Sequence, residues 1–247
     1  MKITGKFNVL FLIVIDMNVK FIRTCILFLM GSLVFLSCRR FCTPIKPSDK
    51  IVSKQYKYEK IRGVSVSDEI ILNYFPIARS NNVLVTGPDN VVSALKMKRD
   101  VAGILHFEIS GRDKFKYDSD NQRLHIQVSI PCINHFKAMN GSSIYVMDNL
   151  YSSNEIIAQA YSDSQIKFAV LQASKVNFAS YTDSEITACI KSDNCNVQSY
   201  TNSTISLSGF ASFLNVTVSA SIVDASKLSC KRITETTIDE GKLKHKD

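Results

Sequence analysis

Four segments in the second half of the chain decide the fold: FKAMNGSSIYV (136–146), AQAYSDSQIKF (158–168), FASYTDSEITA (178–188) and VQSYTNSTISL (197–207). They superpose without an internal gap, and their first residues are 22, 20 and 19 positions apart. Each segment carries a serine followed two places later by an isoleucine, at Ser142/Ile144, Ser164/Ile166, Ser184/Ile186 and Ser203/Ile205. Self-similarity at a fixed period is typical of repeat proteins.

The pattern of each unit predicts a strand, a polar turn and a second strand. A single unit of this kind cannot bury its own apolar positions. Stacking the units about 4.8 Å apart places equivalent residues in columns, so that the isoleucine column fills a continuous interior. The sequence therefore predicts an all-β fold, a right-handed parallel β-helix-like solenoid of ~20-residue coils. An antiparallel sandwich is the alternative that alternation alone would permit.

The part of the chain before these repeats also reads as short alternating strands, and no helical period is evident. Leu124 to Ile130 alternates apolar and polar residues, and Phe115 and Tyr117 precede a turn over residues 118–121. We therefore expect N-terminal β-hairpins, including one that joins 115–117 to 124–130. Residues 56–130 are expected to cover one end of the solenoid, and residues 224–240 the other.

The N-terminus resembles an export signal. Residues 17–38, MNVKFIRTCILFLMGSLVFLSC, combine two basic residues, an apolar stretch and a small residue before Cys38. This pattern predicts a signal peptide within residues 1–37 and lipidation of Cys38 as in bacterial lipoproteins. Translation is expected to start at Met17, and a genuine extended leader from Met1 is the alternative. A cleaved signal without lipid and an uncleaved anchor are the alternatives to lipidation. Residues 38–55 are expected to be a tether, 56–240 the folded domain and 241–247 a solvated tail.

Composition narrows the classes of function. The chain has 247 residues, a formal net charge of +8 and 45% hydrophobic residues. The positive excess is mild and spread along the chain, so no nucleic-acid partner is expected. Among the seven cysteines there is no C-x-x-C motif, which argues against a metal site. The cysteines after Cys38 are expected to be small core residues, although Cys189 and Cys195 could pair in an oxidising compartment.

Several motifs resemble the putative auto-transporter adhesin, head GIN domain family of Bacteroidota envelope proteins. They are YEKIRGVSVSDEIIL (58–72), NVLVTGPDN (82–90), LHIQVSIP (124–131) and the repeats that begin with NGSSIYV (140–146). The resemblance covers roughly residues 56 to 238. It implies a solenoid-like all-β fold and an envelope location, and adhesion by name only.

One column of the repeat is aromatic and holds Tyr161, Tyr181 and Tyr200. Because Ala160 and Ser180 fall on the interior side of the register, these tyrosines should point outward. They are the candidate ligand-facing ladder, for a glycan or a protein, and packing between coils is the alternative reading.

The next column of interest holds Asp163, Asp183 and Asn202. Aspartate before serine in a turn is expected to bond its own backbone, and a calcium site is the less favoured alternative because the glycine-rich form of calcium-binding β-rolls is missing. We therefore expect no cofactor and no metal.

These observations predict a non-catalytic, lipid-anchored protein of the cell envelope with an adhesin-like binding or structural role. Its expected partners are the membrane, through the lipid, and an envelope protein or glycan. The basic residues Arg39 and Arg40 after Cys38 favour the periplasmic face of the outer membrane. The alternative is a carbohydrate-active β-helix enzyme, which would need clustered acidic residues on one sheet.

Overall fold

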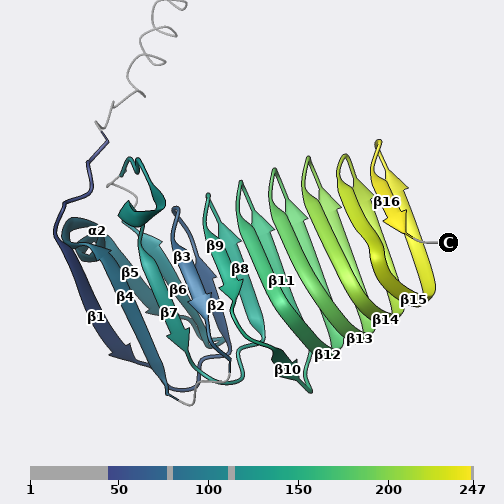
Figure 1. Cartoon of the computed structure of the whole chain (residues 1–247), viewed down its shortest axis with the longest axis horizontal. Coiled ribbons are helices and arrows are strands. Elements are labelled where there is room, and N and C mark those ends of the chain that lie inside the picture. The colour runs from purple at the N-terminus through teal and green to yellow at the C-terminus, as the bar shows by residue number, and fades with distance from the viewer. Residues whose placement is uncertain (1–43, 77–79, 111–114, 246–247) are drawn as a thin grey trace, which may run out of the picture. The chain divides into compact units, whose positions relative to one another are not determined.

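The computed structural model describes residues 44–76, 80–110 and 115–245, which belong to one compact unit. The predicted signal peptide, Met17 and Cys38 lie outside the described residues. The described chain has a nearly all-β fold and forms a β-solenoid of about six turns with about 20 residues per coil, as the repeat predicted. Figure 1 shows the coils side by side from teal to yellow.

The repeats form the regular part of the solenoid, in which long strands bend through successive sheets. Its strands are β8 (His135–Met139), β9 (Ser143–Val146), β10 (Leu150–Ser152), β11 (Ile156–Tyr161), β12 (Gln165–Tyr181), β13 (Glu185–Tyr200), β14 (Thr204–Ser219), β15 (Ile222–Ile238) and β16 (Lys242–His245). Each pairs in parallel with the equivalent strand of the next coil.

The register of these strands reproduces the columns of the sequence. Ile166 lies opposite Ile144 and Ile186, and Ile186 lies opposite Ile205. All four isoleucines are fully buried, as are Phe136 and Ala158 of the facing column, with Phe178 and Val197 at 1% exposure. The two apolar columns therefore meet in one core, as the repeat predicted.

The polar turn between the two strands of a coil has a left-handed backbone at two successive residues. Ser162 and Asp163, Thr182 and Asp183, and Thr201 and Asn202 all have φ between 52° and 59°. Aspartate and asparagine tolerate this conformation better than most residues, which explains their column. The serine that follows is buried in every coil.

The N-terminal part of the solenoid is stacked out of sequence order. The coil made by β2 (Gly63–Val66) and β3 (Ile71–Tyr74) lies between the coil of β8 and β9 and a coil made by β6 (Ile104–Ile109) and β7 (His125–Ser129). All of these pairings are parallel. An early segment is thus inserted between two later ones.

The hairpin expected between residues 115–117 and 124–130 is not formed. Phe115 instead makes an isolated parallel bridge to Ile45, and a short 3-10 helix, η1 (Asp120–Gln122), leads into β7. β7 is already paired on both sides, in parallel with β3 and antiparallel with β4 (Asn82–Pro88). Because neither edge of β7 is free, the segment before it has no place as a hairpin partner.

Antiparallel strands cover the N-terminal end. β5 (Leu95–Arg99) forms a hairpin with β6, and the short helix α2 (Asp89–Ala94), which the sequence did not suggest, joins β4 to β5. β1 (Ile51–Lys57) pairs with β4, so the folded unit begins inside the segment expected to be a tether. Residues 242–245, expected to be part of a solvated tail, form β16 in parallel with β15.

The C-terminal end carries no separate cap in the described residues. Residues 223–228 of the segment expected to cover it are part of the buried core, through Val223, Ala225 and Leu228. The last coil consists of β16 and the second half of β15, and nearly all of its side chains are exposed.

Candidate functional site

The aromatic column lies on the outer surface of one sheet of the solenoid. Tyr161, Tyr181 and Tyr200 are the last residues of their strands in this sheet and are directly opposite one another. The rings of Tyr161 and Tyr181 are stacked with centroids 4.8 Å apart and planes 6° apart. Tyr181 and Tyr200 follow at 5.3 Å and 10°. The three rings form one continuous stack, which we call the tyrosine ladder.

Stacking determines which parts of the tyrosines a ligand can reach. The facing sides of neighbouring rings cover one another. The ammonium group of Lys137 lies 5.2 Å from the centroid of the Tyr161 ring and covers the face of Tyr161 that points away from Tyr181. Burial raises the pKa of the Tyr161 and Tyr181 hydroxyls above the ordinary value, with the neighbouring tyrosine adding to it. Ring edges and hydroxyl groups remain available along the ladder, and among the described residues no ring or cation is stacked on the far face of Tyr200.

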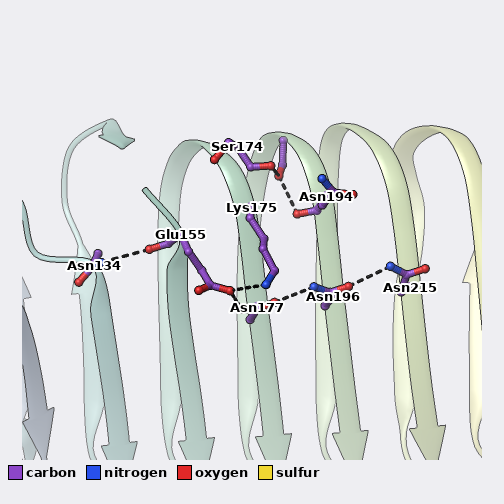
Figure 2. Close-up of polar contacts among 9 residues, drawn as sticks. Asn134, Glu155, Ser174, Lys175, Asn177, Asn194, Asn196 and Asn215 are labelled. Carbon is purple, nitrogen blue, oxygen red and sulfur yellow. Dashed lines mark hydrogen bonds and ion pairs between the residues drawn. The ribbon is translucent and has the colours of Figure 1, made fainter. Parts of the chain in front are cut away.

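A second ladder, of asparagines, runs along the same sheet (Figure 2). Asn215 Nδ2 donates to Asn196 Oδ1 at 2.9 Å, and Asn196 Nδ2 donates to Asn177 Oδ1 at 2.7 Å. Asn177 Nδ2 donates to Glu155 Oε1, and Lys175 Nζ lies 2.7 Å from the same oxygen. Amide ladders of this kind join each coil to the next.

Glu155 ends this asparagine ladder. Hydrogen bonds from Lys175 and Asn177 hold the pKa of the Glu155 carboxyl below its ordinary value of 4.5. The main-chain oxygen of Glu155 also accepts a hydrogen bond from Asn134 Nδ2 at 3.2 Å. The carboxylate is thus a charged end group that satisfies the last amide of the row.

Between the two ladders lies a third column of outward residues: Lys137, Gln159, Ala179, Gln198, Thr217 and Thr236. We call the outer side of this sheet, with its tyrosine, glutamine/threonine and asparagine columns, the ladder face. Its central coils are rich in hydroxyl and amide groups and carry few charges. It offers hydrogen-bonding groups repeated once per coil.

The turn column does not have the chemistry expected of it. The side chains of Asp163, Asp183 and Asn202 are exposed, and no hydrogen bond from them to their own backbone is found in the described residues. The left-handed backbone, rather than an Asx turn, accounts for their residue type. No group of three potential metal ligands occurs among the described His, Cys, Asp and Glu residues.

The described cysteines are free thiols. Cys195 is fully buried, Cys189 and Cys230 are half-buried, and Cys132 is exposed. Burial raises the pKa of the Cys195 thiol well above its ordinary range. Cys189 and Cys195 therefore form no disulfide, and Cys195 fits the expected role of a small core residue.

The grooves on the described surface include three shallow ones, with volumes of about 230, 360 and 340 Å³. Each is lined by one acidic residue: Asp193, Glu240 and Asp224 respectively. Glycoside hydrolysis ordinarily uses two carboxyl groups that flank the bond, and none of these grooves supplies such a pair. No helix within the described ranges reaches the length and apolar character that crossing a bilayer requires.

The repeat in the sequence predicted the tyrosine and serine columns, whereas the asparagine ladder was not predicted. Its signal was present, since Asn177, Asn196 and Asn215 are each 19 residues apart. The copy of the repeat at residues 64–72, where VSVSDEIIL has the same strand, acidic turn and strand, was not predicted either. Asp68 and Glu69 there share the left-handed backbone of the later turns.

Comparison with known proteins gives a family and a fold. The family model described as "Putative auto-transporter adhesin, head GIN domain" matches residues 58–239. A putative adhesin from Parabacteroides distasonis superposes with a TM-score of 0.67 at 14% identity, covering 82% of this chain and 99% of that one. One from Bacteroides fragilis gives 0.58 at 14% identity, covering 82% and 100%. No curated protein matches the chain.

Proposed function

Because the chain belongs to the putative auto-transporter adhesin, head GIN domain family, we propose that it is a non-catalytic, lipid-anchored protein of the cell envelope that binds glycans through the ladder face. The observation that carries this proposal is the ladder face itself. Hydroxyl and amide groups recur there once per coil, about 4.8 Å apart. A repetitive array of this kind suits a polymer that offers hydroxyl groups at regular intervals.

The chemistry of the face favours a glycan over a protein partner. Protein interfaces are built around large desolvated apolar or aromatic anchors. On the ladder face, the faces of the tyrosine rings are largely covered by one another, while Gln159, Gln198 and Thr217 offer neutral donors and acceptors. The neutral amide and hydroxyl groups can hydrogen-bond to the hydroxyl groups of a sugar chain, and the ring edges of the tyrosines can contact its apolar C–H patches.

The binding role is tested with the full chain, purified in detergent, on an array of neutral and acidic glycans. The double variant Gln159→Glu/Gln198→Glu places two negative charges on outward positions of the ladder face, of which Gln159 is half-buried and Gln198 is exposed. The control, Lys167→Glu/Thr187→Glu, places charges on outward positions of the segments that follow the turns, residues 165–168 and 185–188, away from the ladder face. We expect the wild type and the control to bind and the ladder-face variant to lose most of its signal. Equal binding by both variants would place the site elsewhere.

The anchor is a separate part of the proposal and depends on Cys38. The lipid would hold the protein at the outer membrane, with the periplasmic face favoured by Arg39 and Arg40. Metabolic labelling with a palmitate analogue compares Cys38→Ala with Cys42→Ala. We expect the label to be lost in the first variant and kept in the second. A label that survives in Cys38→Ala would show that Cys38 is not the lipidated residue.

A further inference from the structure

The column of the tyrosine ladder continues beyond Tyr200 with a serine on the next coil and an isoleucine on the coil after that. In this column, Tyr200 lies opposite Ser219, and Ser219 lies opposite Ile238. Ser219 is the one small residue between an aromatic ring and an aliphatic side chain. We call the space over Ser219, between Tyr200 and Ile238, the Tyr200 notch.

The dimensions of the notch follow from the rise of the coils. Neighbouring strands are about 4.8 Å apart, so Tyr200 and Ile238 are about 10 Å apart along the solenoid. The rings below are stacked at 4.8 and 5.3 Å, one per coil. One further six-membered ring at the level of Ser219 would therefore contact the free face of Tyr200 on one side and Ile238 on the other.

The free surfaces around the notch are apolar at its two walls and polar at its rim. Ile238 is 44% exposed although it is a large aliphatic residue. Two residues earlier on the same three strands lie Gln198, Thr217 and Thr236, whose outward side chains end in amide or hydroxyl groups. None of these six outward positions carries a charge.

From this arrangement we propose that the Tyr200 notch binds one pyranose ring of a neutral glycan. A pyranose offers an apolar C–H face for the ring of Tyr200 and peripheral hydroxyl groups for Gln198, Thr217 and Thr236. An aromatic side chain from a partner protein would fill the same space but would leave that polar rim without partners. The assignment rests on the proposed glycan-binding function and names the position at which a sugar is held.

Two substitutions test the notch from opposite directions. Ser219→Tyr adds the missing fourth ring and fills the space, and it extends the existing stack, so the fold is expected to be kept. Tyr200→Ser instead removes the aromatic ring on which the sugar would stack. Ser206→Tyr adds the same side chain at an outward position of the segment that follows the turn, opposite Thr187 and away from the ladder face, and serves as the control. Thermal unfolding of each variant shows whether it is folded.

Binding is measured on the same glycan array and then as affinity for the neutral oligosaccharide that gives the strongest wild-type signal. Tyrosine fluorescence is a suitable readout because the chain contains no tryptophan. We expect Ser219→Tyr and Tyr200→Ser each to weaken binding at least tenfold, with Ser206→Tyr unchanged. Methyl pyranosides should compete with the oligosaccharide in the wild type.

The outcomes separate the notch from the wider proposal. Wild-type binding that Gln159→Glu/Gln198→Glu abolishes but a folded Ser219→Tyr leaves intact would overturn the notch and support the ladder face. A wild-type protein that binds no glycan on the array would overturn glycan binding, and the notch with it.

Discussion

At the residue scale, a buried serine hydroxyl closes each turn of the solenoid. Ser184 Oγ accepts the N–H of Tyr181 at 3.0 Å and lies 2.8 and 3.0 Å from the carbonyl oxygens of Tyr181 and Ala160. Ala160 belongs to the preceding coil, so the hydroxyl links two coils as well as the two ends of one turn. The sequence predicted the serine column, but not these partners, because the partners are backbone atoms that are identical for every residue type.

Ser184→Ala is therefore expected to destabilise the protein. It leaves the N–H of Tyr181 and the carbonyl of Ala160 without their partner in a buried place, which costs about 1–3 kcal/mol. Urea unfolding followed by circular dichroism measures the change. Ser206→Ala, at an outward position, is the control and should change the free energy of unfolding by less than about 0.5 kcal/mol. A Ser184→Ala protein as stable as the control would refute the structural role of the column.

Ser142 is the exception in this column. Its Oγ is buried and has no hydrogen-bond partner among the described residues. The coil before it is the inserted one, in which Ile70 precedes the second strand where the later coils have serine. The repeat is thus least regular at the place where the order of the coils in space departs from their order in the sequence.

At the element scale, the asparagine ladder makes stability depend on pH through Glu155. The pKa of this carboxyl is lowered in the folded state, so its contribution is fully present above the ordinary value of 4.5 and is lost as the pH falls below it. The group is partly exposed, and we expect the contribution to be less than about 1 kcal/mol.

The test compares the wild type with Glu155→Gln by urea unfolding between pH 7 and pH 3. The wild type should be the more stable at pH 7, and the difference should disappear at the acid end. Asp163→Asn, which removes an exposed carboxylate that makes no hydrogen bond to the turn, is the matched variant and should show no such trend. A difference that is independent of pH would mean that the charge of Glu155 does not matter.

The elements show why the sequence predicted one half of the fold better than the other. Between residues 136 and 207, each coil stacks on the one just before it, so a column in the sequence is also a column in space. Before residue 131, β2 and β3 pair with β6 and β7 across tens of residues. Alternation predicts such strands but does not identify their partners, and for that reason the expected hairpin at 115–130 was wrong.

At the scale of the whole molecule, the exposed end of the solenoid is protected by its own last coil. The interior column that contains Val216 continues to Glu235, and the column that contains Val218 continues to Thr237. Glu235 accepts a hydrogen bond from Thr237. Inward-pointing charged residues on an edge strand oppose pairing with another chain.

Glu235→Val should therefore promote association of the protein. The substitution restores the apolar column at the terminal coil, so that a second copy can pair with it. Sedimentation of the full chain in detergent at several concentrations should show oligomers for Glu235→Val, and monomers for Thr234→Val, whose side chain faces outward. Monomers for both variants would mean that Glu235 is not what keeps this end from pairing.

The functional proposals depend on a tyrosine ladder that is continuous through three coils and open at Tyr200. Near-ultraviolet circular dichroism measures this directly, because the chain has nine tyrosines and no tryptophan. Tyr181→Leu removes both stacked pairs, Tyr200→Leu removes one, and Tyr151→Leu removes a ring that is 64% exposed and outside the stack. We expect the tyrosine signal to fall most for Tyr181→Leu, less for Tyr200→Leu and least for Tyr151→Leu. Equal losses in the three variants would contradict this expectation.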